Sequence, residues 1–175
     1  GPTQALHGAA RRRRATWRTL LRGDRFEIGG VDVRVLHPPP PDWERQRPRN
    51  DDSLVLELRY GDVSMVLTGD AGRDVEAAVL PGLDLASLVV LKVGHHGSAT
   101  SSSAAFLSAL HPRVALISAG RRNPYGHPVP AVLARLRRAG AEIFRTDQHG
   151  AVEVTTDGAT IDVRTHTGEV RHVRR

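Results

Sequence analysis

Short apolar runs alternate with polar turns along most of the chain, and two of these runs end in side chains that can bind a metal ion. Residues 67–70 read Leu-Thr-Gly-Asp, and residues 91–98 read Leu-Lys-Val-Gly-His-His-Gly-Ser. Near-continuous apolar runs are typical of strands buried on both faces, and open α/β sheets place their sites at the carboxyl ends of such strands. The pattern therefore predicts that Asp70 and the paired His95 and His96 lie at one edge of a sheet.

The rest of the pattern predicts an α/β chain in which strands outnumber helices. Period-two alternation around two-residue turns predicts hairpins, and apolar positions at helical spacing predict short crossover helices. We expect strands at residues 26–28, 31–35, 54–58, 63–67, 88–93, 114–118, 143–145, 152–155 and 160–164, and helices at residues 73–80, around Phe106–Leu110 and at 129–139.

Two structural alternatives to a metal site stay open at this point. Asp70 could cap the helix that begins near Gly72, and the two histidines could belong to a polar turn. A shared site explains better why both elements end consecutive strands separated by one helical crossover. Carboxylate and imidazole groups on rigid supports suit a divalent cation such as zinc or manganese.

Composition divides the chain into three parts. Residues 1–22 form a basic segment with Arg11 to Arg14 in a row, expected to be the tail of an amphipathic helix with Leu20 and Leu21 packed inward. The first two residues, Gly-Pro, resemble the remnant of a cleaved tag, so the sequence is expected to begin inside a larger protein. Residues 23–170 form the domain, and residues 171–175 form a basic tail that we expect to be frayed.

Charge favours an anionic partner. The formal charge is +6 with a sequence pI near 11.0, almost wholly from arginine, since Lys92 is the only lysine. Arginine binds phosphate oxygens in a fork, so nucleic acid is a plausible partner, although genomic base composition explains such enrichment equally well. The polar loop at 41–52, with Trp43 and three arginines, is a candidate substrate contact or simply surface.

Several classes of site and location are excluded. The chain has no cysteine, so it has no disulfide and no thiolate metal site. No stretch reaches the roughly 18 apolar residues of a membrane span, and the basic amino-terminal segment lacks the apolar region of a secretory signal. A donor-rich segment at residues 119–128 follows a predicted strand and suits a phosphate, or else it is a turn that caps the next helix.

Six segments together carry a resemblance to a known family. These segments are, in chain order, residues 50–55, 67–70, 91–98, 117–120, 123–128 and 145–147. Together they resemble the metallo-β-lactamase-fold domain at the carboxyl end of the ComEC family of DNA-uptake channels. The resemblance covers nearly the whole chain from about Gly23 onward. It implies an αββα sandwich with a two-metal hydrolytic site, which degrades the DNA strand that does not enter the cell.

Site roles follow from the same resemblance. Asp70 resembles the aspartate that bridges two metals, and His96 the late metal-ligating histidine. His95 would be its neighbour, either at the substrate or behind the metal ligands. His127 resembles the family's Gly-His-Pro histidine, which meets a phosphate or a leaving group. The implied catalytic residues are thus Asp70, His95 and His127, the implied metal ligands are Asp70 and His96, and Asn50 and Asp51 lie where relatives of the fold often carry another histidine ligand.

Further residues are candidates for contact with the phosphate of the substrate. Ser98, Lys92, Arg121, Asn123 and His127 carry donors on the loops that follow the predicted strands, and they could stabilise developing negative charge. Lys92 alternatively extends from a strand end without a functional contact.

One departure from the family pattern is large. The signature cluster His-x-His-x-Asp-His does not occur in this sequence. The chain therefore resembles the carboxyl-terminal portion of the fold, and an incomplete sandwich would leave one sheet face and part of the metal site uncovered.

Three functions stay open from sequence. The first is a metal-dependent phosphodiester hydrolase that acts on single-stranded DNA with two divalent ions, at the extracytoplasmic face of the bacterial membrane and attached to the rest of a membrane-embedded channel, with no lipid contact of its own. The second is a catalytically incomplete DNA-binding module, favoured by the missing ligands and the arginine surplus. The third is an assembly fragment that forms a homodimer through its exposed sheet face.

Overall fold

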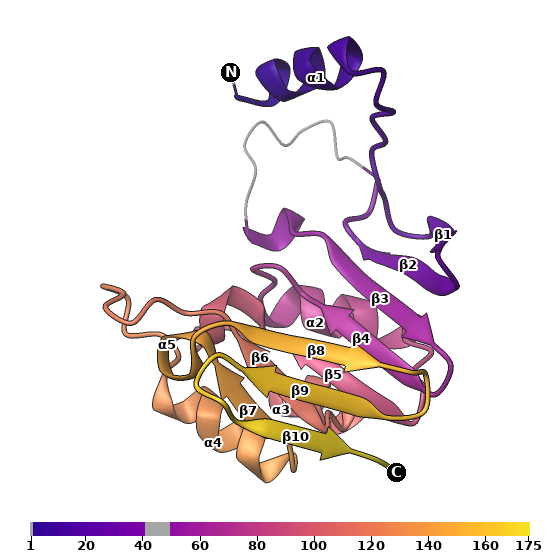
Figure 1. The fold of residues 1–175 in the computed structure, drawn as a ribbon. Coiled ribbons are helices and arrows are strands. Elements are labelled where there is room, and N and C mark those ends of the chain that lie inside the picture. The colour runs from indigo at the N-terminus through magenta and orange to yellow at the C-terminus, as the bar shows by residue number, and fades with distance from the viewer. Residues whose placement is uncertain (1, 41–49) are drawn as a thin grey trace.

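A seven-stranded mixed sheet forms the centre of the molecule. The structure is a computed structural model that describes residues 2–40 and 50–175 (Figure 1). The strands lie side by side in sequence order, with the antiparallel part first and the parallel part after it. They are β1 (Arg25–Ile28), β2 (Val31–His37), β3 (Val55–Tyr60), β4 (Val63–Leu67), β5 (Leu88–Lys92), β6 (Val114–Ile117) and β7 (Glu142–Arg145).

Crossover helices join the parallel strands and cover one face of this sheet. Buried side chains from these helices pack against β4, β5 and β6 in one apolar core, which includes Val75, Phe106 and Leu136. The helices are α1 (Pro2–Arg12), α2 (Arg73–Val79), α3 (Ala104–Leu110), α4 (Pro130–Arg138) and α5 (Thr146–His149), with 3-10 turns η1 (Asn50–Asp52), η2 (Leu80–Gly82) and η3 (Gly94–Gly97). None of the helices in residues 2–40 and 50–175 is both long and apolar enough to cross a membrane.

A second, three-stranded antiparallel sheet packs on the other face. It consists of β8 (Val152–Thr156), β9 (Ile161–Thr165) and β10 (Val170–Val173), in the order β10-β9-β8. Ile161, Val163 and Val173 pack against Leu88 and Val90 of the large sheet in a second core. Figure 1 shows the resulting layers, with the three-stranded sheet on one side of the large sheet and the crossover helices on the other.

The two edges of the large sheet differ in what they carry. The carboxyl ends of β4, β5 and β6 meet at one edge because these strands are parallel neighbours. The β1–β2 turn at Gly29 and Gly30 and the β3–β4 turn at Gly61 lie at the opposite edge, where Asp62 N donates to Gly158 O of the β8–β9 turn.

Several sequence predictions are confirmed and others are wrong. The α/β class, the nine predicted strands and the three predicted crossover helices are confirmed to within a few residues at their ends. The prediction of a frayed carboxyl-terminal tail is wrong, because residues 170–173 form β10 and Val173 is buried. The predicted packing of Leu20 and Leu21 on an amphipathic helix is also wrong, since α1 ends at Arg12. The αββα sandwich of the metallo-β-lactamase fold stays a prediction, and residues 41–49, with Trp43, lie outside the described residues.

Candidate functional site

Asp70 and His96 lie together at the carboxyl edge of the central sheet. β4 and β5 are parallel neighbours with Leu67 opposite Lys92, so the loops that follow them start side by side. The Nε2 atom of His96 is 3.8 Å from Oδ1 of Asp70. The helix-cap alternative for Asp70 is wrong, because the N-cap of α2 is Gly72 and not Asp70.

The loop after β4 holds Asp70 through its backbone. Gly69 has φ +54°, and a Cβ atom there would lie 2.9 Å from Cβ of Ser53, so only glycine fits without strain. Asp70 N donates to Oγ of Ser53 at 3.0 Å. Thr68 Oγ1 donates to Lys92 O at 2.8 Å, which ties the ends of β4 and β5 together. The carboxylate of Asp70 is therefore carried by a fixed loop while it stays open to solvent.

The loop after β5 presents two histidines in an unusual backbone conformation. His95 and His96 have φ of 48° and 55°, in the left-handed region that non-glycine residues adopt at a cost of about 1–3 kcal/mol each. His95 N donates to Gly69 O at 3.0 Å, so this loop is bonded directly to the Asp70 loop. Strain that the surrounding structure maintains in this way is typical of functional sites.

The imidazole of His96 is oriented by a backbone carbonyl. Its Nδ1 lies 2.7 Å from Ser118 O at the end of β6, so Nδ1 carries the proton and donates it to that carbonyl. Nε2 then has a free lone pair on the side of Asp70. A carbonyl that fixes the tautomer in this way is the usual partner of a metal-ligating histidine.

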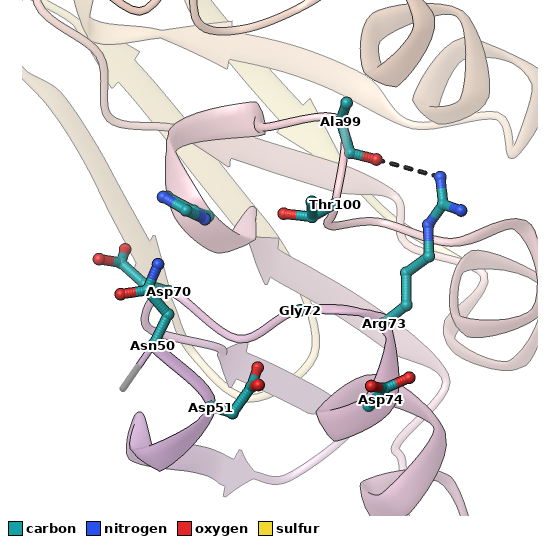
Figure 2. Close-up of a pocket in the computed structure, with 9 residues that line it drawn as sticks. Asn50, Asp51, Asp70, Gly72, Arg73, Asp74, Ala99 and Thr100 are labelled. Carbon is teal, nitrogen blue, oxygen red and sulfur yellow. Dashed lines mark hydrogen bonds between the residues drawn. The ribbon is translucent and has the colours of Figure 1, made fainter. Parts of the chain in front are cut away.

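A pocket of about 610 Å³ opens beside Asp70 (Figure 2). It is lined by residues from three segments of the chain, namely η1, the β4–α2 connection with the first turn of α2, and the β5–α3 connection: Asn50, Asp51, Asp70, Gly72, Arg73, Asp74, His95, Ala99 and Thr100. Figure 2 shows Asn50 next to Asp70 at one end of the pocket and Asp51 below them, and Arg73 donates to Ala99 O at 3.1 Å. The positions predicted to replace a histidine ligand, Asn50 and Asp51, thus belong to the same pocket as Asp70 and His95.

His127 approaches the histidine loop from the segment after β6. Its ring centroid is 5.9 Å from that of His95, with the planes at 73°. Its Nδ1 atom is buried and has no hydrogen-bond partner among the described residues. Asn123 holds His127 in place, because its Nδ2 donates to His127 O and Gly120 O and its Oδ1 accepts from His127 N. Asn123 thus uses its amide group within the loop and positions His127.

The other three predicted phosphate contacts differ in their exposure and in whether their donor groups are already bonded. Ser98 is buried, with its hydroxyl 3.2 Å from that of Thr100. Lys92 Nζ donates to Val93 O, and burial lowers the pKa of Lys92 while the nearby Asp70 opposes that shift. Arg121 is exposed, and none of the ion pairs found in the described part of the chain includes it. Arg121 is therefore the most available of the three.

A buried clamp behind the pocket escaped the sequence analysis. Glu76 of α2 accepts hydrogen bonds from the backbone N–H groups of Ser102 and Ser103, and Arg135 of α4 donates to Ser101 O and Ser102 O. These bonds fix the hydroxyl-rich loop that forms one wall of the pocket. The partners lie 26 to 34 residues apart, so no local pattern could have revealed them.

Asp70 and His96 fit a divalent metal by the chemistry of their donors. The pair offers one carboxylate and one imidazole with a fixed tautomer, which zinc and manganese both accept. Across residues 2–40 and 50–175, no group of three His, Asp or Glu side chains is gathered closely enough to form a metal site by itself. These two residues would therefore supply part of a coordination shell.

The chain is similar to segments of longer proteins from three bacteria. It is 39% identical to "ComE operon protein 3" of Bacillus subtilis over 83% of this chain, and 39% identical to "Competence protein ComA" of Neisseria gonorrhoeae over 74%. It is 40% identical to "Recombination protein 2" of Haemophilus influenzae over 62%. No family model matches the chain.

These similarities concern one part of each relative. The matched segment makes up 18% of the Bacillus and Neisseria proteins and 14% of the Haemophilus protein, so the chain spans less than a fifth of their length. Identity near 40% over most of this chain is nevertheless far above what unrelated sequences share. The comparisons therefore support a relationship between this chain and a competence-protein family.

Proposed function

We propose that this chain supplies part of the active site of a metal-dependent phosphodiester hydrolase that cleaves DNA during uptake. The observation that carries the proposal is the pairing of Asp70 with His96, 3.8 Å apart at the ends of adjacent parallel strands. One relative is named a competence protein and another a ComE operon protein, which supports DNA as the polymer handled.

The residues of this chain have distinct tasks in the proposed reaction. Asp70 and His96 would hold divalent ions, which when bound activate a water molecule and stabilise charge on a phosphate. Asp70 stays fixed through its backbone bond to Ser53, and His96 through Ser118 O, so both donors are oriented before any metal arrives. The chain thereby keeps the ordering cost of metal binding low.

His127 is placed to exchange a proton with the substrate. Its ring lies 5.9 Å from that of His95, which lines the Asp70 pocket, and Asn123 holds its backbone. An imidazole placed beside the pocket in this way suits a general acid at the leaving oxygen. Arg121 and Lys92 would bind the negative charge of the phosphate.

The setting of this reaction is part of the proposal. The chain would act at the extracytoplasmic face of the membrane, next to a membrane-embedded channel, and degrade the strand that is not transported. The names of the relatives and the basic charge of the chain support this setting.

Metal content and cleavage of labelled DNA test the proposal. We expect single-strand cleavage that requires zinc or manganese in a longer protein that also includes a His-x-His-x-Asp-His segment. Asp70→Ala and His96→Ala should each reduce cleavage at least 100-fold and reduce bound metal. Glu27→Ala, which removes an exposed carboxylate at the opposite edge of the sheet, should leave both unchanged.

A different outcome would favour a different function. DNA binding without cleavage under any divalent metal, unaffected by Asp70→Ala, would identify a binding module and overturn the hydrolase proposal. Metal binding that persists in the double variant Asp70→Ala, His96→Ala would show that the metal is held elsewhere.

A further inference from the structure

Tyr125 is the most exposed large apolar side chain in the described part of the chain. Its relative exposure is 77%, while most side chains of its size are at least half covered. An aromatic ring that is left mostly in water needs an explanation, because burying it would be favourable. Tyr125 lies in the segment between β6 and α4, which also carries His127.

Three histidine rings connect Tyr125 to the Asp70 pocket. The centroids of Tyr125 and His127 are 6.0 Å apart with the planes at 25°, in a stacked arrangement. His127 meets His95 at 5.9 Å, and His95 meets His96 at 6.4 Å, both edge to face. We call His96, His95, His127 and Tyr125 the ring row. It begins at the side chain beside Asp70 and ends on a ring whose outer face is open to solvent.

The segment that presents Tyr125 is rigid on both sides. Asn123, two residues before it, bonds to Gly120 O and to both backbone groups of His127. On the other side, Val129 N donates to Gly97 O at 3.0 Å. A Cβ on Gly97 would lie 2.5 Å from Cβ of Pro128, so the two loops are in direct contact. Tyr125 is therefore fixed relative to the histidine loop.

Two arginines precede Tyr125 in the same segment between β6 and α4. Arg121 and Arg122 are exposed, and neither takes part in any ion pair formed within residues 2–40 and 50–175. Exposed aromatic rings beside arginines form the usual surface for single-stranded nucleic acid, where bases stack on the rings and the cations bind the backbone. A duplex offers no free base face to such a ring except at its ends.

We propose that Tyr125 stacks on a base of single-stranded DNA and thereby positions the neighbouring phosphate at the Asp70 end of the ring row. This inference rests on the proposed function only in taking DNA as the ligand. It assigns Tyr125 a substrate contact that sets the preference for single strands, with Arg121 and Arg122 binding phosphates of the same strand.

Binding of a fluorescent oligothymidylate to the 175-residue chain, without added metal, tests the inference. A base stacked on an aromatic ring typically gives about 5- to 100-fold in affinity. We expect Tyr125→Ala to weaken binding by that factor and Tyr125→Phe, which keeps the ring, to bind like the unsubstituted chain. Arg137→Ala removes an exposed arginine on α4 away from the ring row and serves as the matched control for general charge loss.

Two further probes separate stacking from other effects. On an oligonucleotide of the same length with abasic sugars, Tyr125→Ala should have no effect, because no base is present. On blunt duplex DNA its effect should be less than twofold. Thermal unfolding should be unchanged, since the side chain is exposed.

The outcomes also separate this inference from the hydrolase proposal. A Tyr125→Ala variant that binds oligothymidylate as tightly as the unsubstituted chain, or loses equal affinity for the abasic probe, overturns stacking. Absence of oligothymidylate binding by the unsubstituted chain at low salt overturns it as well. Ring-dependent binding without any metal-dependent cleavage would retain the inference and remove the hydrolase.

Discussion

Glu57 is a carboxylate whose two oxygens have different surroundings. Its side chain, on β3, is fully buried. The Oε2 atom accepts hydrogen bonds from Asp84 N and from Nη1 of Arg34, the latter at 3.3 Å. The Oε1 atom has no partner in the described part of the chain. Burial raises the pKa of Glu57, and the Asp84 N–H and the Arg34 guanidinium oppose that shift. The ionised form is thus less favourable in the folded chain than in the unfolded one.

Replacement of Glu57 by glutamine should change how stability depends on pH. A raised pKa in the folded state means that the unsubstituted chain loses stability as pH rises from the ordinary pKa of glutamate to the higher folded value. The melting temperature of the unsubstituted chain relative to Glu57→Gln should therefore fall between pH 4 and pH 8.

Differential scanning calorimetry across that pH range checks this expectation. Glu27→Gln, at an exposed position on β1, is the control for a surface carboxylate. The raised pKa of Glu57 would be contradicted if the melting temperature of the unsubstituted chain rose, relative to that of Glu57→Gln, as the pH increases.

At the scale of elements, one wall of the pocket depends on hydrogen bonds from two helices. Glu76 extends from α2 to the backbone of Ser102 and Ser103, while Arg135 extends from α4 to the carbonyls of the same loop. The loop is thereby held from two helices, although its own residues are mostly serine. Stability of the pocket is thus coupled to the docking of α2 and α4.

Glu76→Ala should destabilise the chain and loosen this loop. Two buried N–H groups would lose a charged acceptor, which costs about 2–4 kcal/mol. Hydrogen exchange at the amides of residues 102 and 103 should accelerate more than exchange in β5. Asp74→Ala, on the exposed side of the same helix, should change stability by less than about 0.5 kcal/mol. Equal protection of the two amides in both variants would rule out the clamp.

Elements with a strong local pattern of apolar residues could be predicted from the sequence. The apolar runs that became β4 and β5 predicted both strands, and the residues released at their ends were those that the structure brings together. β10 was missed because Val-Arg-His-Val shows no period-two alternation, since its two apolar residues are three positions apart, and its one buried residue, Val173, gave little signal. α5 was missed because four polar residues carry no helical period.

Hydrogen-bond partners at the site were beyond any local pattern. Asn123 appeared in the sequence as a free donor, but loop closure makes His127 its partner. Ser98 appeared equally available, but it is buried against Thr100. Such pairings depend on which loops meet after folding, and the clamp formed by Glu76 and Arg135 depends on the packing of two helices.

For the molecule as a whole, excess positive charge sets the conditions under which DNA binding is measurable. The 25 basic residues exceed the 19 acidic ones by 6, and most are arginines on the surface. Each phosphate that such residues neutralise on a single strand changes the slope of log affinity against log salt by about −0.7. Charge of this kind acts on association with any polyanion and carries no sequence preference.

Affinity for single-stranded DNA should consequently fall steeply between 50 and 200 mM salt. A loss of about tenfold over that range would correspond to two or three phosphate contacts. Fluorescence anisotropy titrations at several salt concentrations measure the slope, and a peptide nucleic acid of the same sequence, which lacks phosphates, provides the control. Affinity for DNA that is constant with salt would show that phosphate contacts contribute little.

The separation of the two sheet edges has a practical consequence. All the loops that carry Asp70, His96 and Tyr125 leave from one edge, while the exposed turn at Gly29 and Gly30 lies at the other. Immobilising the protein on a sensor chip through a linker inserted at that turn would leave the pocket facing the flow. Rate constants for DNA binding could then be measured on molecules of uniform orientation, with the pocket not blocked by neighbouring molecules.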